Sequence, residues 1–180
     1  RIAGHLGLDN LIMYYDANNI QLSTTVEEVD SEDVAAKYKA WGWHVIEIDG
    51  CCPEAIRKAL REAKATVGQP TLIIGKTIMG RGAVGPNGEN YENRVNTHGQ
   101  PLSAAGASIE ATIKNLSGDP EAPFQIFPDV QELYAARLQE LRELAKARKQ
   151  EEKTWREENP DRASKLDRWF AGEAPAVNWK

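Results

Sequence analysis

Residues 11–22 read LIMYYDANNIQL, an apolar run that leads into two adjacent carboxamides and then an alternating apolar pair. The run Leu11-Ile12-Met13-Tyr14 predicts a buried strand that ends just before Asn18 and Asn19. In an open parallel sheet, ligands collect beyond the carboxyl ends of the strands, where side-chain and loop carbonyl oxygens converge. An Asn amide oxygen, with a backbone carbonyl two residues later, suits Mg²⁺ or Ca²⁺. The stretch therefore indicates a ligand site, although an Asn pair after a strand is also ordinary turn chemistry.

Outward from this stretch, strands alternate with helices. Asp30 or Ser31 is the expected cap of a helix that Gly42 ends, and residues 45–48 read as the next strand. Pro53 opens a second helix, and a buried strand is expected after it at residues 72–74. The expected apolar face of this helix consists of Ile56, Ala59, Leu60, Ala63 and Val67. Two successive strand–helix–strand units predict an α/β fold: a parallel sheet with flanking helices.

Composition predicts one soluble core of ordinary size. The 180 residues are 41% hydrophobic and 27% charged, with a formal net charge of -5. This charge argues against nucleic acid or an anionic membrane as the main partner, and no apolar run reaches the length of a membrane span. Cys51 and Cys52 are adjacent, so a bridge between them would be strained, and we expect reduced thiols in a cytoplasmic protein.

The segment between Gly80 and Pro101 is a long connection with several glycines and no clear periodicity. A connection of this length in a compact domain is usually functional or disordered. In one interpretation it is a mobile surface loop in which His98 is merely exposed. In the other, Thr97-His98-Gly99 brings an imidazole to a phosphate-bearing site.

The C-terminal part of the chain is predicted to be helical. Asp129 and Glu132 resemble a capping box after Pro128, and Asp161 is the expected cap of a short last helix that follows Asn159-Pro160. One face of the longer helix is expected to carry Tyr134, Leu138, Leu141, Ala145 and Arg148. Its charge run at 146–152 reads as a solvated face, with a partner-binding helix as the alternative. We therefore divide the chain into an α/β part at 1–128 and a helical extension at 129–180.

Several separated motifs together resemble transketolase. They span nearly the whole chain: IAGHL at 2–6, LIMYYDANNIQL at 11–22, AWGWHVIEIDG at 40–50, QPTLIIGKTIMGRG at 69–82, THGQPL at 97–102 and AGEAPAVNW at 171–179. The resemblance places the chain in the second part of the family's thiamine-diphosphate-binding domain, near the linker to the next domain. The family's Gly-Asp-Gly motif, whose Asp is a metal ligand, is missing, so we expect a fragment of a larger polypeptide that holds half a metal site.

The resemblance also implies roles for individual residues. Asn18 matches the family's side-chain metal ligand and Ile20 its backbone-carbonyl ligand, for Mg²⁺ or Ca²⁺. Leu22 and Met79 fall at apolar positions against the cofactor, where the family often has Ile; without the resemblance both would read as ordinary core. His98 matches the His that lies between the cofactor diphosphate and the donor substrate, where it binds phosphate and assists proton movements.

The resemblance implies that the intact protein is a ketol transferase that acts on sugar phosphates with thiamine diphosphate as cofactor. It also implies a homodimer with the active site between subunits. The isolated chain is expected to be inactive. A relative such as dihydroxyacetone synthase shares these motifs, and a non-catalytic assembly module built on the charged helix is the alternative from another class.

Overall fold

The computed structural model describes residues 1–175 and 177, so the last motif is covered only in part: its residues 176, 178 and 179 lie outside the described residues. The chain divides into two units, Arg1–Pro123 and Phe124–Lys180, which are described separately.

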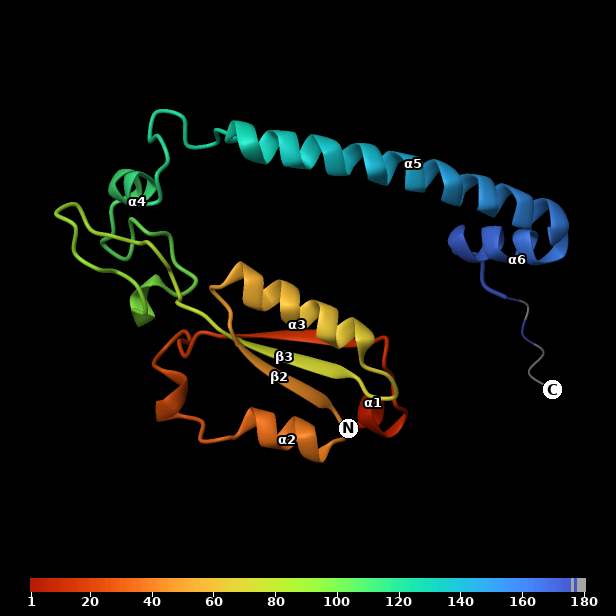
Figure 1. Cartoon of the computed structure of the whole chain (residues 1–180), viewed down its shortest axis with the longest axis horizontal. Coiled ribbons are helices and arrows are strands. Elements are labelled where there is room, and N and C mark those ends of the chain that lie inside the picture. Colours follow the sequence, from red (N-terminus) through yellow and green to blue (C-terminus); the bar gives the residue numbers. More distant parts are fainter. Residues whose placement is uncertain (176, 178–180) are drawn as a thin grey trace. The chain divides into compact units, whose positions relative to one another are not determined.

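The described residues of the first unit form a three-stranded parallel sheet in the order β1–β3–β2 (Figure 1). The strands are β1 (Ile12–Ala17), β2 (His44–Asp49) and β3 (Thr71–Lys76). Thr71 pairs with Ile12 on one side and with His44 on the other, so all three strands start and end in register. The predicted α/β fold is confirmed, and β3 is the most buried strand because it lies between the other two.

Helices cover both faces of this sheet (Figure 1). On one face, α1 (Ile2–His5) and α2 (Val34–Ala40) pack on a core of Trp43, Leu72 and Ile74. On the other face, Ala59 and Ala63 of α3 (Pro53–Ala65) pack on Ile73. Successive residues of β3 thus point to opposite faces, and a continuous apolar strand is what a sheet covered on both sides requires.

Beyond β3 the chain makes a long connection with little regular structure. It contains the 3₁₀ turn η2 (Val95–Thr97) and then α4 (Ile109–Asn115), a helix that periodicity did not reveal. An earlier 3₁₀ turn, η1 (Val26–Glu28), follows β1. Ser108 caps α4 by accepting a hydrogen bond from the Ala111 N–H at 3.1 Å. The helix was missed because seven residues are too few for a clear apolar stripe.

The second unit consists of α5 (Pro128–Glu158) and α6 (Pro160–Phe170). Arg156 of α5 bonds Asp167 of α6 at 2.7 Å and Glu152 of its own helix at 2.8 Å, and both carboxylates raise the pKa of its guanidinium. The predicted face of α5 forms no buried stripe, since Tyr134, Leu138 and Leu141 are all exposed. The helical C-terminal segment is confirmed.

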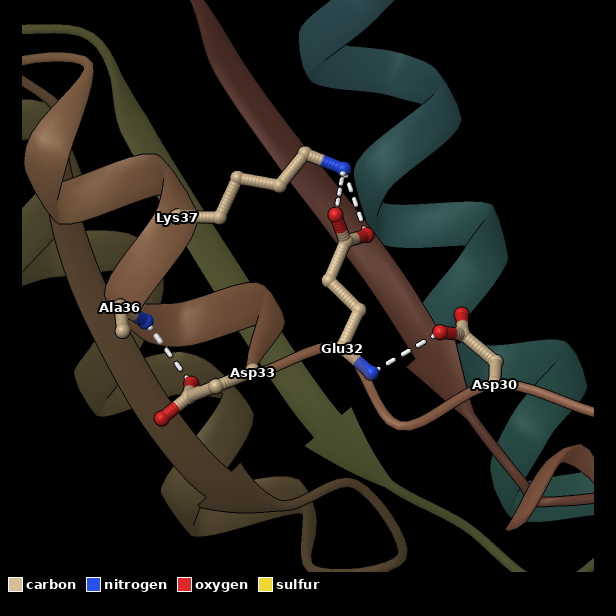
Figure 2. Close-up of polar contacts among 5 residues, drawn as sticks. All are labelled: Asp30, Glu32, Asp33, Ala36 and Lys37. Carbon is tan, nitrogen blue, oxygen red and sulfur yellow. Dashed lines mark hydrogen bonds and ion pairs between the residues drawn. The ribbon is translucent and has the colours of Figure 1, made fainter.

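Several local predictions were wrong. Asp33, not Asp30 or Ser31, caps α2: its Oδ1 accepts the Ala36 N–H at 2.8 Å (Figure 2). The Asp30 carboxylate instead accepts the Glu32 N–H at 2.9 Å, and the Lys37 ammonium donates to the Glu32 carboxylate at 2.6 Å (Figure 2). A capping residue directly precedes the first helical turn. Asp30 instead forms a local turn with Glu32, so the helix begins after Asp33, three residues later.

Two further helix starts use no side-chain cap. Phe127 precedes α5 and Asn159 precedes α6, each followed by Pro at the first helical position, so Asp129 and Asp161 lie inside the helices. An N–H at the first helical position has no intrahelical partner, so Pro loses no bond there, and its φ is already helical, which is why it opens these helices.

Burial predictions failed at the periphery of the sheet. Strand β1 was expected to be buried, yet Met13, Tyr14 and Tyr15 are exposed, because β1 is an edge strand in the described part of the chain. Leu60 is 39% exposed on α3, and Val67, at 83%, lies beyond the helix end. The buried face of α3 is therefore limited to the small residues that allow close approach to the sheet.

Candidate functional site

A cavity of about 550 Å³ opens where β1 and β3 end. Its lining comes from the turn after β1, from the end of β3 and from the long connection, and includes Asn18, Asn19, Ile20, Lys76, Thr77 and Asn93. Ligand sites in open parallel sheets lie at this edge. The structure thus places a cavity at the end of the strand that the sequence singled out.

The turn after β1 has a defined geometry. The Oδ1 atom of Asn18 accepts the Ile20 N–H at 3.0 Å, and Asn19 adopts a left-handed φ of 61° between them. Its carbonyl accepts the Val26 N–H at 3.0 Å, and Ile20 bridges to Thr25. Ile20 is buried. Asn tolerates a left-handed φ better than most residues, so this sequence suits the turn.

The same turn leaves oxygen atoms for a cation. An amide oxygen has two lone pairs, and the Ile20 N–H uses one of those on Asn18. In the described part of the chain, the Ile20 carbonyl accepts no backbone hydrogen bond. Both are hard, neutral donors that fit Mg²⁺ or Ca²⁺. Turn chemistry and a ligand role are thus compatible here.

These donors could supply only part of a metal site. Among the described residues, no group of three or more His, Cys, Asp or Glu side chains is arranged to hold a metal ion. Six or more oxygens surround these cations, so Asn18 and Ile20 need ligands from water, a cofactor or further protein. Cys51 and Cys52 are free thiols, as predicted.

The side chain of Tyr14 lies across the sheet near the carboxyl ends of its strands. An added Cβ on Gly75 would overlap its hydroxyl, and one on Gly50 would lie 2.7 Å from the same oxygen. The tyrosine therefore reaches from β1 across β3 to the end of β2. Although 43% of its surface is exposed, desolvation of the phenol that lies over Gly75 raises the pKa of Tyr14, and the negative charges of Asp16, Cys51 and Asp49 raise it further.

The long connection returns to the cavity through Asn93. Its side chain accepts the Met79 N–H at 3.1 Å, and its own N–H donates to the Met79 carbonyl at 2.9 Å. The Thr97 hydroxyl lies 3.6 Å from the Met79 sulfur. Met79 is half-buried beneath the connection rather than part of the cavity lining.

His98 follows directly on this cluster. The residue is half-buried, and its Nδ1 atom is buried with no hydrogen-bond partner among the described residues. Leu22 is 74% exposed, and its side chain lies 3.5 Å from the position that a Cβ on Gly99 would take. The turn after β1 and the His98 segment therefore approach each other at Leu22.

Of the five predicted site residues, Asn18 and Ile20 line the cavity, whereas Leu22, Met79 and His98 lie on the adjoining segments. Sequence reasoning missed Thr77 and Asn93. Thr77 is a polar residue directly after a buried strand, the signal that identified Asn18. Asn93 gave no such signal, since only its left-handed φ of 55° and its contacts set it apart.

No helix in the described part of the chain has both the length and the apolar character needed to cross a membrane. The charged residues that line the cavity are Glu27 and Lys76, so the acidic balance of the sequence is not concentrated there.

Comparison with known families supports a specific identity. The family described as "Transketolase, thiamine diphosphate binding domain" matches residues 1–175. Transketolase 1 of Pasteurella multocida is 35% identical over 186 residues, covering 99% of this chain and 25% of the relative. Transketolase 2 of Xanthobacter flavus is 41% identical over 137 residues, covering 76% and 19%. Dihydroxyacetone synthase of Pichia angusta is 34% identical over 181 residues, covering 99% and 24%.

Solved structures give the same picture. The transketolase of Leishmania mexicana superposes with a TM-score of 0.79 at 29% identity, covering 97% of this chain and 25% of that one. A Pichia stipitis transketolase in complex with sedoheptulose-7-phosphate gives 0.78 at 30% identity, covering 99% and 25%. The chain thus spans a quarter or less of the length of these relatives.

Proposed function

This chain belongs to the transketolase family, and on that basis we propose that the protein transfers a two-carbon ketol unit from a ketose phosphate to an aldose phosphate. The observation that carries the proposal is the Asn18–Ile20 turn, since both residues line a cavity at the carboxyl end of β1 and can offer hard oxygen donors. The Pichia stipitis relative bound to sedoheptulose-7-phosphate supports a ketose phosphate as donor.

Within this proposal, each site residue has a physical task. Asn18 and Ile20 hold Mg²⁺ or Ca²⁺, which neutralises the diphosphate of thiamine diphosphate. Leu22 and Met79 provide apolar contacts to the cofactor ring. The cofactor supplies carbanion stabilisation when bound, while the protein binds and orients it.

His98 is the proposed catalytic residue and also the proposed contact to the cofactor diphosphate and the donor substrate. Its buried Nδ1 has no partner among the described residues, so a ligand oxygen would satisfy it. An imidazole changes charge near neutral pH, which suits both phosphate binding and proton transfer.

The wider setting is also proposed. Residues 1–128 are part of the cofactor-binding domain and 129–180 a helical extension toward the interdomain linker. The protein is a cytoplasmic homodimer with its active site between subunits, and the remaining domains complete the site. The 180-residue chain alone is then inactive, because isolated donors do not offset the cost of ordering a ligand.

Dihydroxyacetone synthase is the second candidate, because the Pichia angusta relative matches 99% of the chain at 34% identity. The two enzymes differ in acceptor, so a comparison of turnover with an aldose phosphate and with formaldehyde separates them. A non-catalytic module, the third alternative, predicts no turnover with either.

Asn18→Ala tests the proposed site. Loss of one metal ligand is expected to weaken Mg²⁺-dependent binding of thiamine diphosphate roughly 10-fold or more. Titration calorimetry on the complete protein measures this. Asn19→Gly is the matched control, since Gly adopts the left-handed φ of 61° freely and should keep the affinity. Equal affinity of Asn18→Ala and wild type would show that the Asn pair is only a turn.

A further inference from the structure

Thr77 ties the end of β3 to the end of β1 by two contacts. Its N–H donates to the Ala17 carbonyl at 3.3 Å, one residue beyond the strand pairing that ends at Ala17 and Lys76. Its hydroxyl donates to the carboxylate of Asp16. The backbone of any residue could make the first contact, whereas the second requires a hydroxyl.

Both ends of this connection lead to the candidate site. On the β1 side, Asp16 is two residues before Asn18, whose side chain shapes the turn. On the β3 side, Thr77 is two residues before Met79, which exchanges two hydrogen bonds with Asn93. Thr77 and Asn93 line the same cavity as Asn18.

The connection continues from Asn93 to His98. The Thr97 hydroxyl donates to the Arg94 carbonyl at 2.7 Å, and the His98 N–H donates to the Val95 carbonyl at 3.1 Å. These bonds order residues 93–98 locally, and the two hydrogen bonds between Asn93 and Met79 attach this segment to the chain that follows β3. The direction in which the chain leaves β3 at Thr77 therefore sets where this segment lies relative to the turn at Asn18.

We propose that the hydrogen bond between Thr77 and Asp16 is a positioning contact, which holds the Asn18–Ile20 turn and the segment that carries His98 at a fixed separation. The consequence for ligand binding rests on the proposed function, whereas the coupling between the two segments does not. Asp16 and Thr77 touch no ligand in this proposal and act through Asn18 and His98.

The bond is partly exposed, so its effect on global stability is small, and its effect on geometry is the relevant one. A binding site must be held within a fraction of an ångström of its productive geometry by contacts behind the residues that touch the ligand. Loss of such supporting contacts typically lowers metal affinity by about 10- to 100-fold.

Thr77→Val tests the proposal, because Val keeps the branched shape and removes the hydroxyl. Thr77→Ser restores a hydroxyl and serves as the rescue variant. Thr66→Val is the matched control: its hydroxyl donates to the Glu62 carbonyl at 3.0 Å and lies near His44, at the opposite end of the strands. It removes a threonine hydroxyl that also donates a hydrogen bond, away from the site.

The first measurement is amide hydrogen exchange on the cofactor-free protein. In Thr77→Val the amides of Ile20 and Asn93 are expected to exchange roughly 10-fold faster, because their bonds open more often once the segments separate. Thr77→Ser should exchange close to wild type, and Thr66→Val should change only amides near α3. Unchanged exchange at both Ile20 and Asn93 would overturn the positioning role.

The second measurement is the affinity for thiamine diphosphate with Mg²⁺, followed by intrinsic fluorescence. Thr77→Val is expected to lose roughly 10-fold, with recovery in Thr77→Ser. Asp16→Ala removes the acceptor of this bond, and combined with Thr77→Val it should lose little more than either change alone, because both break the same bond. Additive losses would contradict the proposal.

Asn18→Ala separates the two possible failures. If Asn18→Ala weakens binding and Thr77→Val does not, the positioning contact is wrong and the proposed function stands. If Asn18→Ala has no effect while exchange at Ile20 and Asn93 still rises in Thr77→Val, the coupling stands and the cofactor site is wrong.

Discussion

The hydroxyl of Tyr14 lies directly over Gly75, so close that a Cβ at residue 75 would overlap it unless the tyrosine ring moved. Tyr14 belongs to the edge strand β1 and Gly75 to the central strand β3. The glycine is therefore explained by a neighbouring strand, not by its own backbone conformation.

Gly75→Ala is expected to destabilise the fold by about 1–3 kcal/mol, the usual cost of forcing an extra carbon into a packed region. In a Tyr14→Ala background the same change should cost much less, because the obstructing ring is gone. Urea unfolding of the four proteins measures both costs. Equal costs in the two backgrounds would show that Tyr14 is not the obstacle.

The raised pKa of Tyr14 predicts a loss of stability in alkali. Below pH 10.0, the pKa of an unperturbed tyrosine, Tyr14 is protonated in both the folded and the unfolded state, so this group does not make stability depend on pH there. Above it the unfolded state ionises first, and stability falls until the pH passes the folded pKa. Tyr14→Phe should remove this contribution. Urea midpoints between about pH 8 and pH 11 test it, and parallel curves for both proteins would contradict it.

His98→Ala is expected to lower the turnover of the complete protein about 100-fold, while the thermal midpoint changes little. A ligand contact acts on the reaction, whereas a core histidine acts on the fold. Steady-state kinetics and thermal unfolding of the same preparation distinguish these roles. His5→Ala is the control, since His5 is exposed on α1 and outside the cavity. Wild-type turnover of His98→Ala would remove His98 from the mechanism.

Asp33→Ala is expected to lose about 1 kcal/mol of stability, because the Ala36 N–H loses its cap. Ser31→Ala should change stability much less, since Asp33 alone caps α2 by its side chain. Urea unfolding at neutral pH measures both. A larger loss for Ser31→Ala than for Asp33→Ala would mean that the helix begins earlier than the structure places it.

Local pattern was sufficient for the order and type of the main elements. The apolar run at residues 72–74, the Pro at 53 and the Gly at 42 predicted β3, α3 and the end of α2, because strand period, helix start and helix end are set by neighbouring residues. The position of the Asn18 turn followed in the same way. Burial was less predictable: β1 has the composition of a buried strand but lies at the edge of the sheet.

The sequence alone therefore determined that β1 ends in a turn rich in amide oxygens, since that depends on residues next to one another. Only the tertiary structure decided what surrounds the turn: Thr77 on Asp16, 61 positions away, Asn93 at the cavity and Leu22 beside Gly99. Such contacts join segments whose separation along the chain carries no periodic signal. They arise when the parallel register brings the carboxyl ends of β1 and β3 to one edge, which is a property of the assembled sheet.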